Sequence, residues 1–217
     1  MLWFIGLGVS GISELSDRTL SVIKNAEIVY LESFTSPITE SEKEELETIC
    51  NGEFKLAKRW LGEDGNEILE NAKKKETVLV SYGDPYIATT HLELKTRAIK
   101  NNIETKAIHS SSIVSSLIGE AGLHYYKIGK VLTIMNDPKS MITPYNIIFH
   151  NLLNKSHSLI LLEYNEDKLF FLSPHDAISL LLEVEKTQNR KIISPDTFVI
   201  IASRIGKNEQ KIISRKK

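Results

Sequence analysis

Residues 80–91 read Val-Ser-Tyr-Gly-Asp-Pro-Tyr-Ile-Ala-Thr-Thr-His, and this stretch decides the fold class. The apolar run at 77–80 predicts a buried strand, which the turn residues Gly83, Asp84 and Pro85 bring to an end. Glycine adopts positive φ without steric cost and proline fixes its own φ, so the carboxylate between them is held in a narrow range of directions. In an open α/β sheet, ligands bind at this carboxyl edge of the strands.

A second interpretation of the same turn stays open. Asp84 can cap a helix that begins at Pro85, because aspartate is a favoured N-cap and proline suits the first helical turn. A helical pattern does follow, at residues 92–100. The turn alone therefore predicts either a capped helix start or a carboxylate that faces a ligand.

The composition argues against several classes of protein. Among 217 residues, 27 Lys and Arg nearly balance 28 Asp and Glu, which argues against a nucleic-acid protein that depends on phosphate neutralisation. Cys50 is the only cysteine, so the sequence has no disulfide framework and fits a reducing cytoplasm. The apolar start at 2–5 breaks at Gly6 and has no basic leader. We expect a cytoplasmic chain that begins as written and contacts no membrane.

The hydrophobic periodicity alternates between strand and helix along the chain, which predicts an α/β fold. The predicted strands cover residues 2–5, 28–31, 54–56, 77–80, 104–108, 131–135, 158–162 and 197–202. The predicted helices cover residues 15–26, 41–49, 66–74, 92–100, 113–120, 145–153 and 174–185. The basic residues 211–217 are expected to form a solvated, frayed tail.

Three consecutive serines at 110–112 separate the predicted strand at 104–108 from the predicted helix at 113–120. Small polar residues of this kind are typical of a crossing between domains. We therefore expect two α/β domains, residues 1–109 and 110–217, with a cofactor cleft between them. The serine hydroxyls and the free amides of the helix start can bind a ligand, or they can simply cap the helix.

The glycines Gly6, Gly8 and Gly11 follow the first strand and match the GxGxxG pattern of dinucleotide-binding proteins. Glu32 ends the second strand at roughly the distance expected of a ribose-binding acid. A Rossmann-type oxidoreductase that uses NAD is therefore the rival interpretation. It is weakened because the next helix starts only near Ser16, whereas phosphate binding needs helix-terminal amides beside the glycines. No hydride-transfer pair is recognisable downstream either.

The six histidines do not indicate a metal site, because no pair has the close HxxxH spacing of zinc ligands on one helix. Each is more simply a core or surface imidazole. His91 and His109 are candidates for a general base, but the sequence assigns that role to neither of them.

Four blocks of sequence resemble the diphthine synthases, the diphthamide-pathway members of the tetrapyrrole methylase fold. The blocks are residues 5–8 (Ile-Gly-Leu-Gly), 30–36 (Tyr-Leu-Glu-Ser-Phe-Thr-Ser), 83–91 (Gly-Asp-Pro through Ala-Thr-Thr-His), and 108–113 together with 122–129 (Gly-Leu-His-Tyr-Tyr-Lys-Ile-Gly). They occur in the order and spacing of that family over almost the whole chain.

This resemblance implies an S-adenosylmethionine-dependent methyltransferase with two α/β domains, no metal, and a cofactor held in the cleft. The implied substrate is translation elongation factor 2, in which a histidine carries a 3-amino-3-carboxypropyl group. Methylation of its amino group gives diphthine, and eukaryotic members of the family also form a methyl ester. A homodimer is implied as well. A catalytically impaired binding protein of the same pathway stays open as an alternative.

Matched block by block, the resemblance implies cofactor contacts at seven positions. They are Val9, Asp84, Ile87, Ser112, Ile113, Leu162 and Ile205. The family continues beyond Ile205 with a segment that supplies a further contact, whereas this sequence stops at Lys217. We expect either a reduced second domain, in which a dimer or a rearranged edge compensates, or a truncated sequence with weakened cofactor binding.

Overall fold

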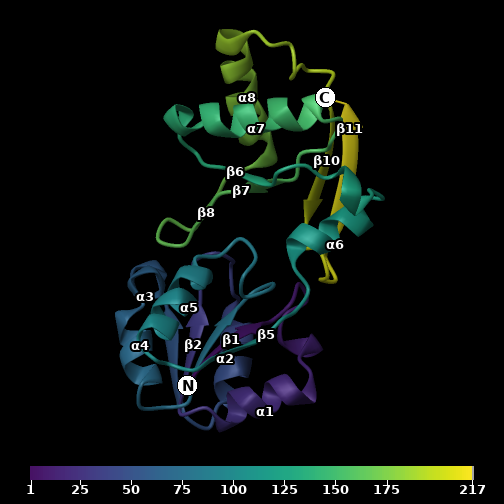
Figure 1. The fold of residues 1–217 in the computed structure, drawn as a ribbon. Coiled ribbons are helices and arrows are strands. Elements are labelled where there is room, and N and C mark those ends of the chain that lie inside the picture. The colour runs from purple at the N-terminus through teal and green to yellow at the C-terminus, as the bar shows by residue number, and fades with distance from the viewer. Residues whose placement is uncertain (217) are drawn as a thin grey trace. The chain divides into compact units, whose positions relative to one another are not determined.

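The structure is a computed structural model that describes residues 1–216. The chain divides into two compact units, Met1–Ile113 and Val114–Lys217 (Figure 1). The serine segment at 110–112 forms the loop just before the end of the first unit. Each unit has its own apolar core.

The first unit is built on a sheet of five parallel strands in the order β3-β2-β4-β1-β5. Its strands are β1 (Leu2–Gly6), β2 (Ile28–Glu32), β3 (Glu53–Ala57), β4 (Thr77–Ser81) and β5 (Thr105–Ile108). Leu2 of β1 pairs with Thr77 on one side and with Thr105 on the other. Because the strands run parallel, the loops that follow β4, β1 and β5 leave the sheet side by side at one edge.

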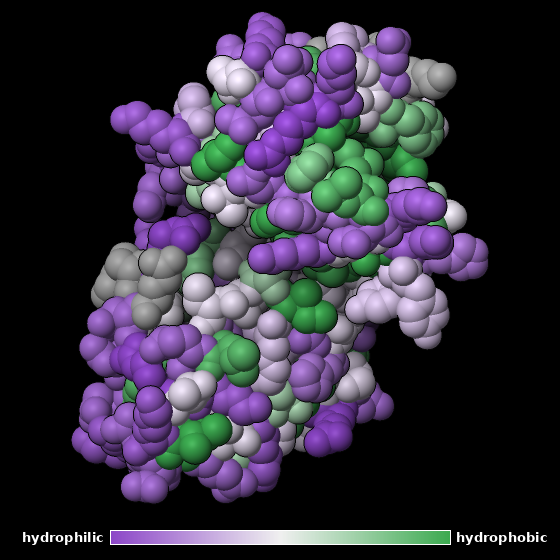
Figure 2. Space-filling model, turned by 45° about the horizontal axis from the view of Figure 1, so that its top comes forward, coloured by the Kyte–Doolittle hydropathy of each residue, from purple (hydrophilic) through white to green (hydrophobic). Residues whose placement is uncertain are grey.

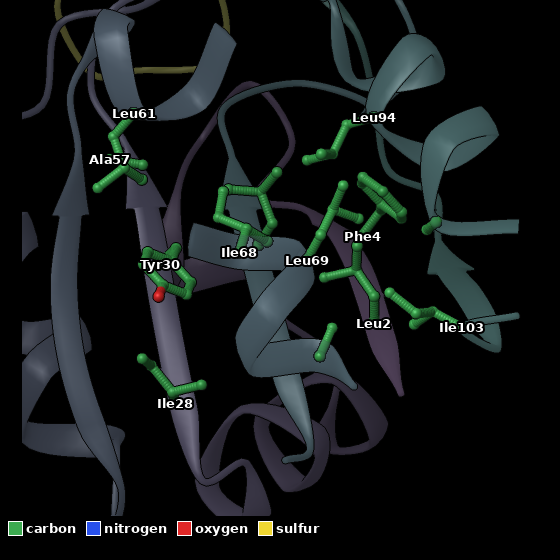
Figure 3. Close-up of a cluster of buried hydrophobic side chains, with 13 residues drawn as sticks. Leu2, Phe4, Ile28, Tyr30, Ala57, Leu61, Ile68, Leu69, Leu94 and Ile103 are labelled. Carbon is green, nitrogen blue, oxygen red and sulfur yellow. The ribbon is translucent and has the colours of Figure 1, made fainter. Parts of the chain in front are cut away.

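Both faces of this sheet are covered, which explains why β1, β2 and β4 read as continuous apolar runs. Successive side chains of a strand point to opposite faces. Leu2 and Phe4 therefore join the core cluster on one face, together with Tyr30 (Figure 3). Ile5 and Val29 belong to the cluster on the other face.

Helices cover the two faces in a three-layer arrangement. They are α1 (Asp17–Asn25), α2 (Glu40–Ile49), α3 (Arg59–Asp64), α4 (Asn66–Ala72) and α5 (His91–Lys100). Ile23 of α1 and Leu46 of α2 pack into one cluster, while residues of α3, α4 and α5 pack into the other. The Ser16 hydroxyl caps α1 by accepting a hydrogen bond from the amide of Thr19.

The second unit has three helices and three pairs of strands in the part of the chain described. Its helices are α6 (Ile113–Glu120), α7 (Ile142–Leu153) and α8 (Pro174–Gln188), and its strands are β6 (Leu132–Ile134), β7 (Ile160–Leu162), β8 (Tyr164–Asn165), β9 (Phe170–Phe171), β10 (Phe198–Ser203) and β11 (Lys211–Lys216). The β6–β7 pair is parallel, and the other two pairs are antiparallel. Ile134, Met141 and Leu181 lie in the core of this unit, where α7 and α8 meet β6.

Every strand and helix predicted from periodicity is present, with ends that move by a few residues. The short 3₁₀ helices are η1 (Ile12–Glu14), η2 (Tyr125–Lys127) and η3 (Pro138–Ser140). The predicted frayed tail is wrong over the described residues, because Lys211–Lys216 forms β11 with Ile213 opposite Ile201 of β10. Two adjacent β-branched isoleucines favour a strand here despite the basic residues around them. Lys217 lies outside the described residues.

The outer surface of each unit is mostly hydrophilic on the face drawn in Figure 2, with small apolar patches between the polar side chains. Helices long and apolar enough to cross a bilayer do not occur among residues 1–216.

Candidate functional site

Three loops meet at the carboxyl edge of the first unit's sheet. The loop after β1 and the loop after β4 are joined by two backbone hydrogen bonds, from the amide of Gly8 to the carbonyl of Gly83 (3.1 Å) and back from the amide of Gly83 to Gly8 (3.0 Å). The loop after β5 is attached through the Ser111 hydroxyl, which accepts a hydrogen bond from the amide of Val9 (3.0 Å). The glycine loop, the aspartate turn and the serine segment thus form one edge.

Glycine makes this close approach possible. A Cβ on Gly6 would overlap with the carbonyl oxygen of Gly83, and a Cβ on Gly8 would lie 2.8 Å from the Ser110 hydroxyl. Gly8 and Gly83 also have φ of +73° and +69°, a region that side-chain-bearing residues rarely adopt. At Gly83, by contrast, an added Cβ would come no closer than 3.9 Å to its nearest neighbours, Ser111 and Ser112. At Gly83 the positive φ, rather than a lack of room for a side chain, therefore favours glycine.

The buried carboxylate of Asp84 connects two of these loops by hydrogen bonds. The residue is 5% exposed, and both oxygens accept hydrogen bonds: Oδ1 from the amide of Tyr86 (3.0 Å), and Oδ2 from His109 Nδ1 (2.7 Å) and the amide of Ser110 (3.4 Å). Asp84 thereby forms an Asx turn and ties the loop after β4 to the end of β5.

The alternative that Asp84 caps a helix beginning at Pro85 is wrong. No helix follows Pro85 directly, and α5 begins six residues later, at His91. The carbonyl of Pro85 instead accepts hydrogen bonds from the Thr89 hydroxyl (2.7 Å) and from Nδ1 of His91 (3.0 Å). These side-chain bonds hold an irregular loop in place, with Ala88 in the left-handed region at φ 59°. Asp84 is therefore a loop residue rather than a helix cap.

A buried pair, Glu32 and His91, was not found from the sequence. The Glu32 carboxylate accepts hydrogen bonds from the amides of Phe34 (2.8 Å) and Thr35 (2.6 Å) and from the Thr35 hydroxyl (2.6 Å). Nε2 of His91 lies 3.9 Å from Glu32 Oε2, and no hydrogen-bond partner for it occurs within residues 1–216. Both side chains are 1% exposed.

Burial sets the protonation of this pair. Desolvation lowers the pKa of His91, and the opposing attraction of Glu32 is weaker than the effect of burial. We favour the neutral imidazole because Glu32 already has three closer donors. Burial and the nearby Asp84 carboxylate also raise the pKa of Tyr86, to about 12, so its phenol stays protonated.

Five of the seven predicted site residues lie at this edge of the first unit. Val9 and Ser112 belong to the two loops that contact each other, Asp84 is their buried anchor, and Ile87 and Ile113 are 43% and 36% exposed. The remaining two residues belong to the second unit. Leu162 ends β7, and Ile205 is buried at 4% exposure.

Comparison with known proteins identifies the family. The model of the Tetrapyrrole (Corrin/Porphyrin) Methylases matches residues 1–216. The chain belongs to this family. Among tetrapyrrole methylases, the diphthine synthase of Methanocaldococcus jannaschii is 32% identical over 218 residues, covering 98% of this chain and 84% of its own length. That of Methanosarcina mazei is 34% identical over 209 residues, covering 93% and 78%.

A solved tetrapyrrole methylase supports the same conclusion. A crystal structure of a diphthine synthase has a TM-score of 0.85 and 30% identity to this chain, and it covers 99% of this chain and 81% of its own. The methylase fold expected from the sequence is thereby confirmed. The relatives and this solved structure together identify the chain as an S-adenosylmethionine-dependent methyltransferase of diphthamide biosynthesis.

The rival interpretation as an oxidoreductase is not favoured by these relatives, and the geometry argues against it as well. The Glu32 carboxylate is taken up by three hydrogen bonds within its own loop, so it is not free to bind a ribose. The glycine loop leads into the short η1, and α1 begins only at Asp17. Groups of three or more side chains able to hold a metal do not occur among the described residues.

Proposed function

We propose that this methyltransferase acts on translation elongation factor 2, at a histidine that carries a 3-amino-3-carboxypropyl group. Methylation of the amino group of that side chain gives diphthine. The observation that carries the proposal is the meeting of the glycine loop, the aspartate turn and the serine segment at one edge of the sheet. All three segments overlap with the blocks of sequence that resemble the diphthine synthases.

The edge suits S-adenosylmethionine in two respects. Gly83 is partly exposed and has no side chain, so a ligand can lie against the backbone of this turn. Ile87 and Ile113 expose apolar surface next to it, which suits the adenosine and the thioether carbons. Val9, Asp84 and Ser112 complete the proposed contacts in the first unit, and Leu162 and Ile205 are the proposed contacts from the second unit.

Asp84 acts in this proposal through the loop rather than as a free ligand. Its two oxygens are already hydrogen bonded to the protein, so the carboxylate fixes the path of residues 84–87 and of the serine segment. The cofactor would then be bound by the backbone of this turn. Removing the carboxylate is expected to weaken cofactor binding, because the turn loses the hydrogen bonds that fix its conformation.

The chemistry requires orientation more than a reactive side chain. When bound, the cofactor supplies a methyl group on a positively charged sulfur, which an unprotonated amine accepts by direct displacement. The residues of the edge contribute by fixing the reacting geometry, and oriented reactants can supply up to about 7–11 kcal/mol of barrier reduction. The apolar side chains Val9, Ile87 and Ile113 keep water away from the reacting centre.

The cellular setting is part of the proposal. We place the activity in the cytoplasm, where the elongation factor is found, with a homodimer as the active form and S-adenosylhomocysteine as the product. No metal, nucleic acid or membrane takes part in the proposed reaction.

The test is the transfer of labelled methyl groups from S-adenosylmethionine to elongation factor 2 that carries the aminocarboxypropyl intermediate. The proposal predicts labelling that depends on this intermediate, and unmodified elongation factor 2 serves as the control. Formation of a complex with the factor without transfer of label would instead support the alternative of a non-catalytic binding protein.

A further inference from the structure

The contact between Asp84 and His109 determines which ring nitrogen of the neutral histidine carries the hydrogen. Asp84 Oδ2 lies 2.7 Å from His109 Nδ1, and the other contacts made by the carboxylate are with backbone N–H groups. A carboxylate with such neighbours accepts hydrogen bonds, so Nδ1 carries the hydrogen and donates it. The neutral imidazole therefore has its lone pair on Nε2.

The surroundings of His109 leave this lone pair accessible. The His109 side chain is 65% exposed, whereas its partner Asp84 is buried. The Tyr86 ring and the imidazole form a T-shaped contact, with centroids 5.6 Å apart and an angle of 69° between the rings. His109 directly precedes the serine segment, so its ring stands at the edge proposed to hold the cofactor.

His91, the other candidate from the sequence, cannot offer a base to a substrate. It is 1% exposed, and its Nε2 faces the buried Glu32. Its Nδ1 is bonded to the carbonyl of Pro85. His91 holds the loop after β4, whereas His109 presents a nitrogen to the outside.

We propose that His109 is the general base of the methyl transfer, with Asp84 as its positioning residue. This rests on the proposed function. An alkylammonium substrate has no lone pair for attack, so Nε2 of His109 first accepts one proton from it. The freed pair then forms the new carbon–nitrogen bond while the carbon–sulfur bond breaks and its electrons stay on sulfur. The imidazolium later releases its proton to water.

The charges around the ring support this role. The Asp84 carboxylate lies 2.7 Å from Nδ1 and orients the ring, in the way an aspartate orients a histidine base in hydrolases. Tyr86 stays neutral because its pKa is raised to about 12. On Tyr86, Nζ of Lys95 lies 4.8 Å from the centre of the ring.

The decisive variant is His109→Asn. The asparagine amide can still donate to Asp84 from near the position of Nδ1, so the loop keeps its anchor while the basic nitrogen is lost. Binding of S-adenosylhomocysteine, measured by calorimetry, should then change little. At neutral pH we expect kcat to fall by about 100-fold or more, the usual effect of losing a general base.

The pH profile separates a base from a merely structural residue. At a pH above the pKa of the substrate's own amino group, the substrate amine is already unprotonated. The deficit of His109→Asn should therefore shrink as the pH rises, if His109 removes this proton. A deficit that stays the same at every pH, or no deficit at any pH, would overturn the proposal.

A second readout does not depend on turnover. In ¹⁵N NMR of the ligand-free wild-type protein, we expect the His109 imidazole to be the tautomer with hydrogen on Nδ1, and this preference should be lost in Asp84→Asn. A wild-type imidazole with hydrogen on Nε2 would contradict the inference. If the wild-type enzyme transfers no methyl group at all, the proposed function fails, and the NMR result still decides the tautomer.

Discussion

Gly6 sets how closely the loops after β1 and β4 approach each other. A Cβ there would overlap with the carbonyl of Gly83, which is backbone and cannot rotate away. We therefore predict that Gly6→Ala lowers the free energy of unfolding by about 1–3 kcal/mol, the usual cost of overpacking. Chemical denaturation followed by tryptophan fluorescence measures this change.

The matched control is Gly119→Ala in α6, where the added Cβ has no described atom within 4 Å apart from the neighbouring backbone of the helix itself. Alanine favours the helix there by about 0.5–1 kcal/mol, so calorimetry should show no loss of stability. Equal destabilisation by both substitutions would mean that the steric argument for Gly6 is wrong.

The buried His91 predicts a stability that depends on pH. Its pKa is lowered in the folded protein, so below about pH 6.5 the unfolded chain binds a proton that the folded chain does not. The free energy of unfolding should fall as the pH falls through this window, by at most about 1.4 kcal/mol per pH unit for one proton.

His91→Asn tests this point, because the amide can still donate to the carbonyl of Pro85 but does not titrate. Urea denaturation between about pH 7.5 and pH 5.5 should show a smaller loss of stability for the variant than for the wild type. Identical slopes would contradict the assignment of a neutral, buried His91.

At the residue scale, the sequence was informative wherever the signal was local. The glycines, Asp84 and the serines are marked by turn chemistry within a few neighbouring positions, and the structure brings their loops together. The roles of Asp84 and His109 toward each other were not predictable, because that contact joins residues 25 positions apart. The Glu32–His91 pair was missed for the same reason, although each lies within a block that resembles the family.

The helix α2 shows how a local signal acts on a whole element. Thr39 caps it in a capping box, accepting from the amide of Glu42 (3.2 Å) while the Glu42 carboxylate accepts from the amide of Thr39 (3.0 Å). Thr39→Ala should therefore cost about 0.5–2 kcal/mol of stability by thermal or chemical denaturation.

Thr48 provides the control on the same helix. Its exposed hydroxyl donates back to the carbonyl of Glu44, a bond that gives the helix no net support. Thr48→Ala should leave the stability unchanged or raise it slightly. A loss as large as that of Thr39→Ala would show that the cap is not the cause.

Element types followed from periodicity, whereas their exact ends and pairings did not. Of the two interpretations of the turn at Asp84, the helix start at Pro85 failed because side-chain hydrogen bonds from Thr89 and His91 to the Pro85 carbonyl hold a loop there. The strand β11 was missed because its basic residues resemble a solvated tail, and only pairing with β10 reveals its role. The strand order β3-β2-β4-β1-β5 likewise depends on contacts distant in sequence.

For the whole molecule, the account predicts which nucleoside ligand stabilises the fold. A ligand at a concentration of 100 times its Kd raises the free energy of unfolding by about 2.7 kcal/mol. S-adenosylhomocysteine should therefore raise the melting temperature in a concentration-dependent way. NAD should not, because the Glu32 carboxylate is engaged in its own loop. Stabilisation by NAD alone would restore the oxidoreductase interpretation.

The central claim is that the methyl donor binds at the carboxyl edge of the five-stranded sheet. Titration of the ¹⁵N-labelled protein with S-adenosylhomocysteine tests it most directly, because each backbone amide reports its own surroundings. The account predicts that the largest shifts occur in the glycine loop at Gly8, in the turn at Gly83 and in the serine segment at Ser112. No shifts at millimolar ligand, or shifts confined to the opposite edge around Trp3 and Glu76, would contradict it.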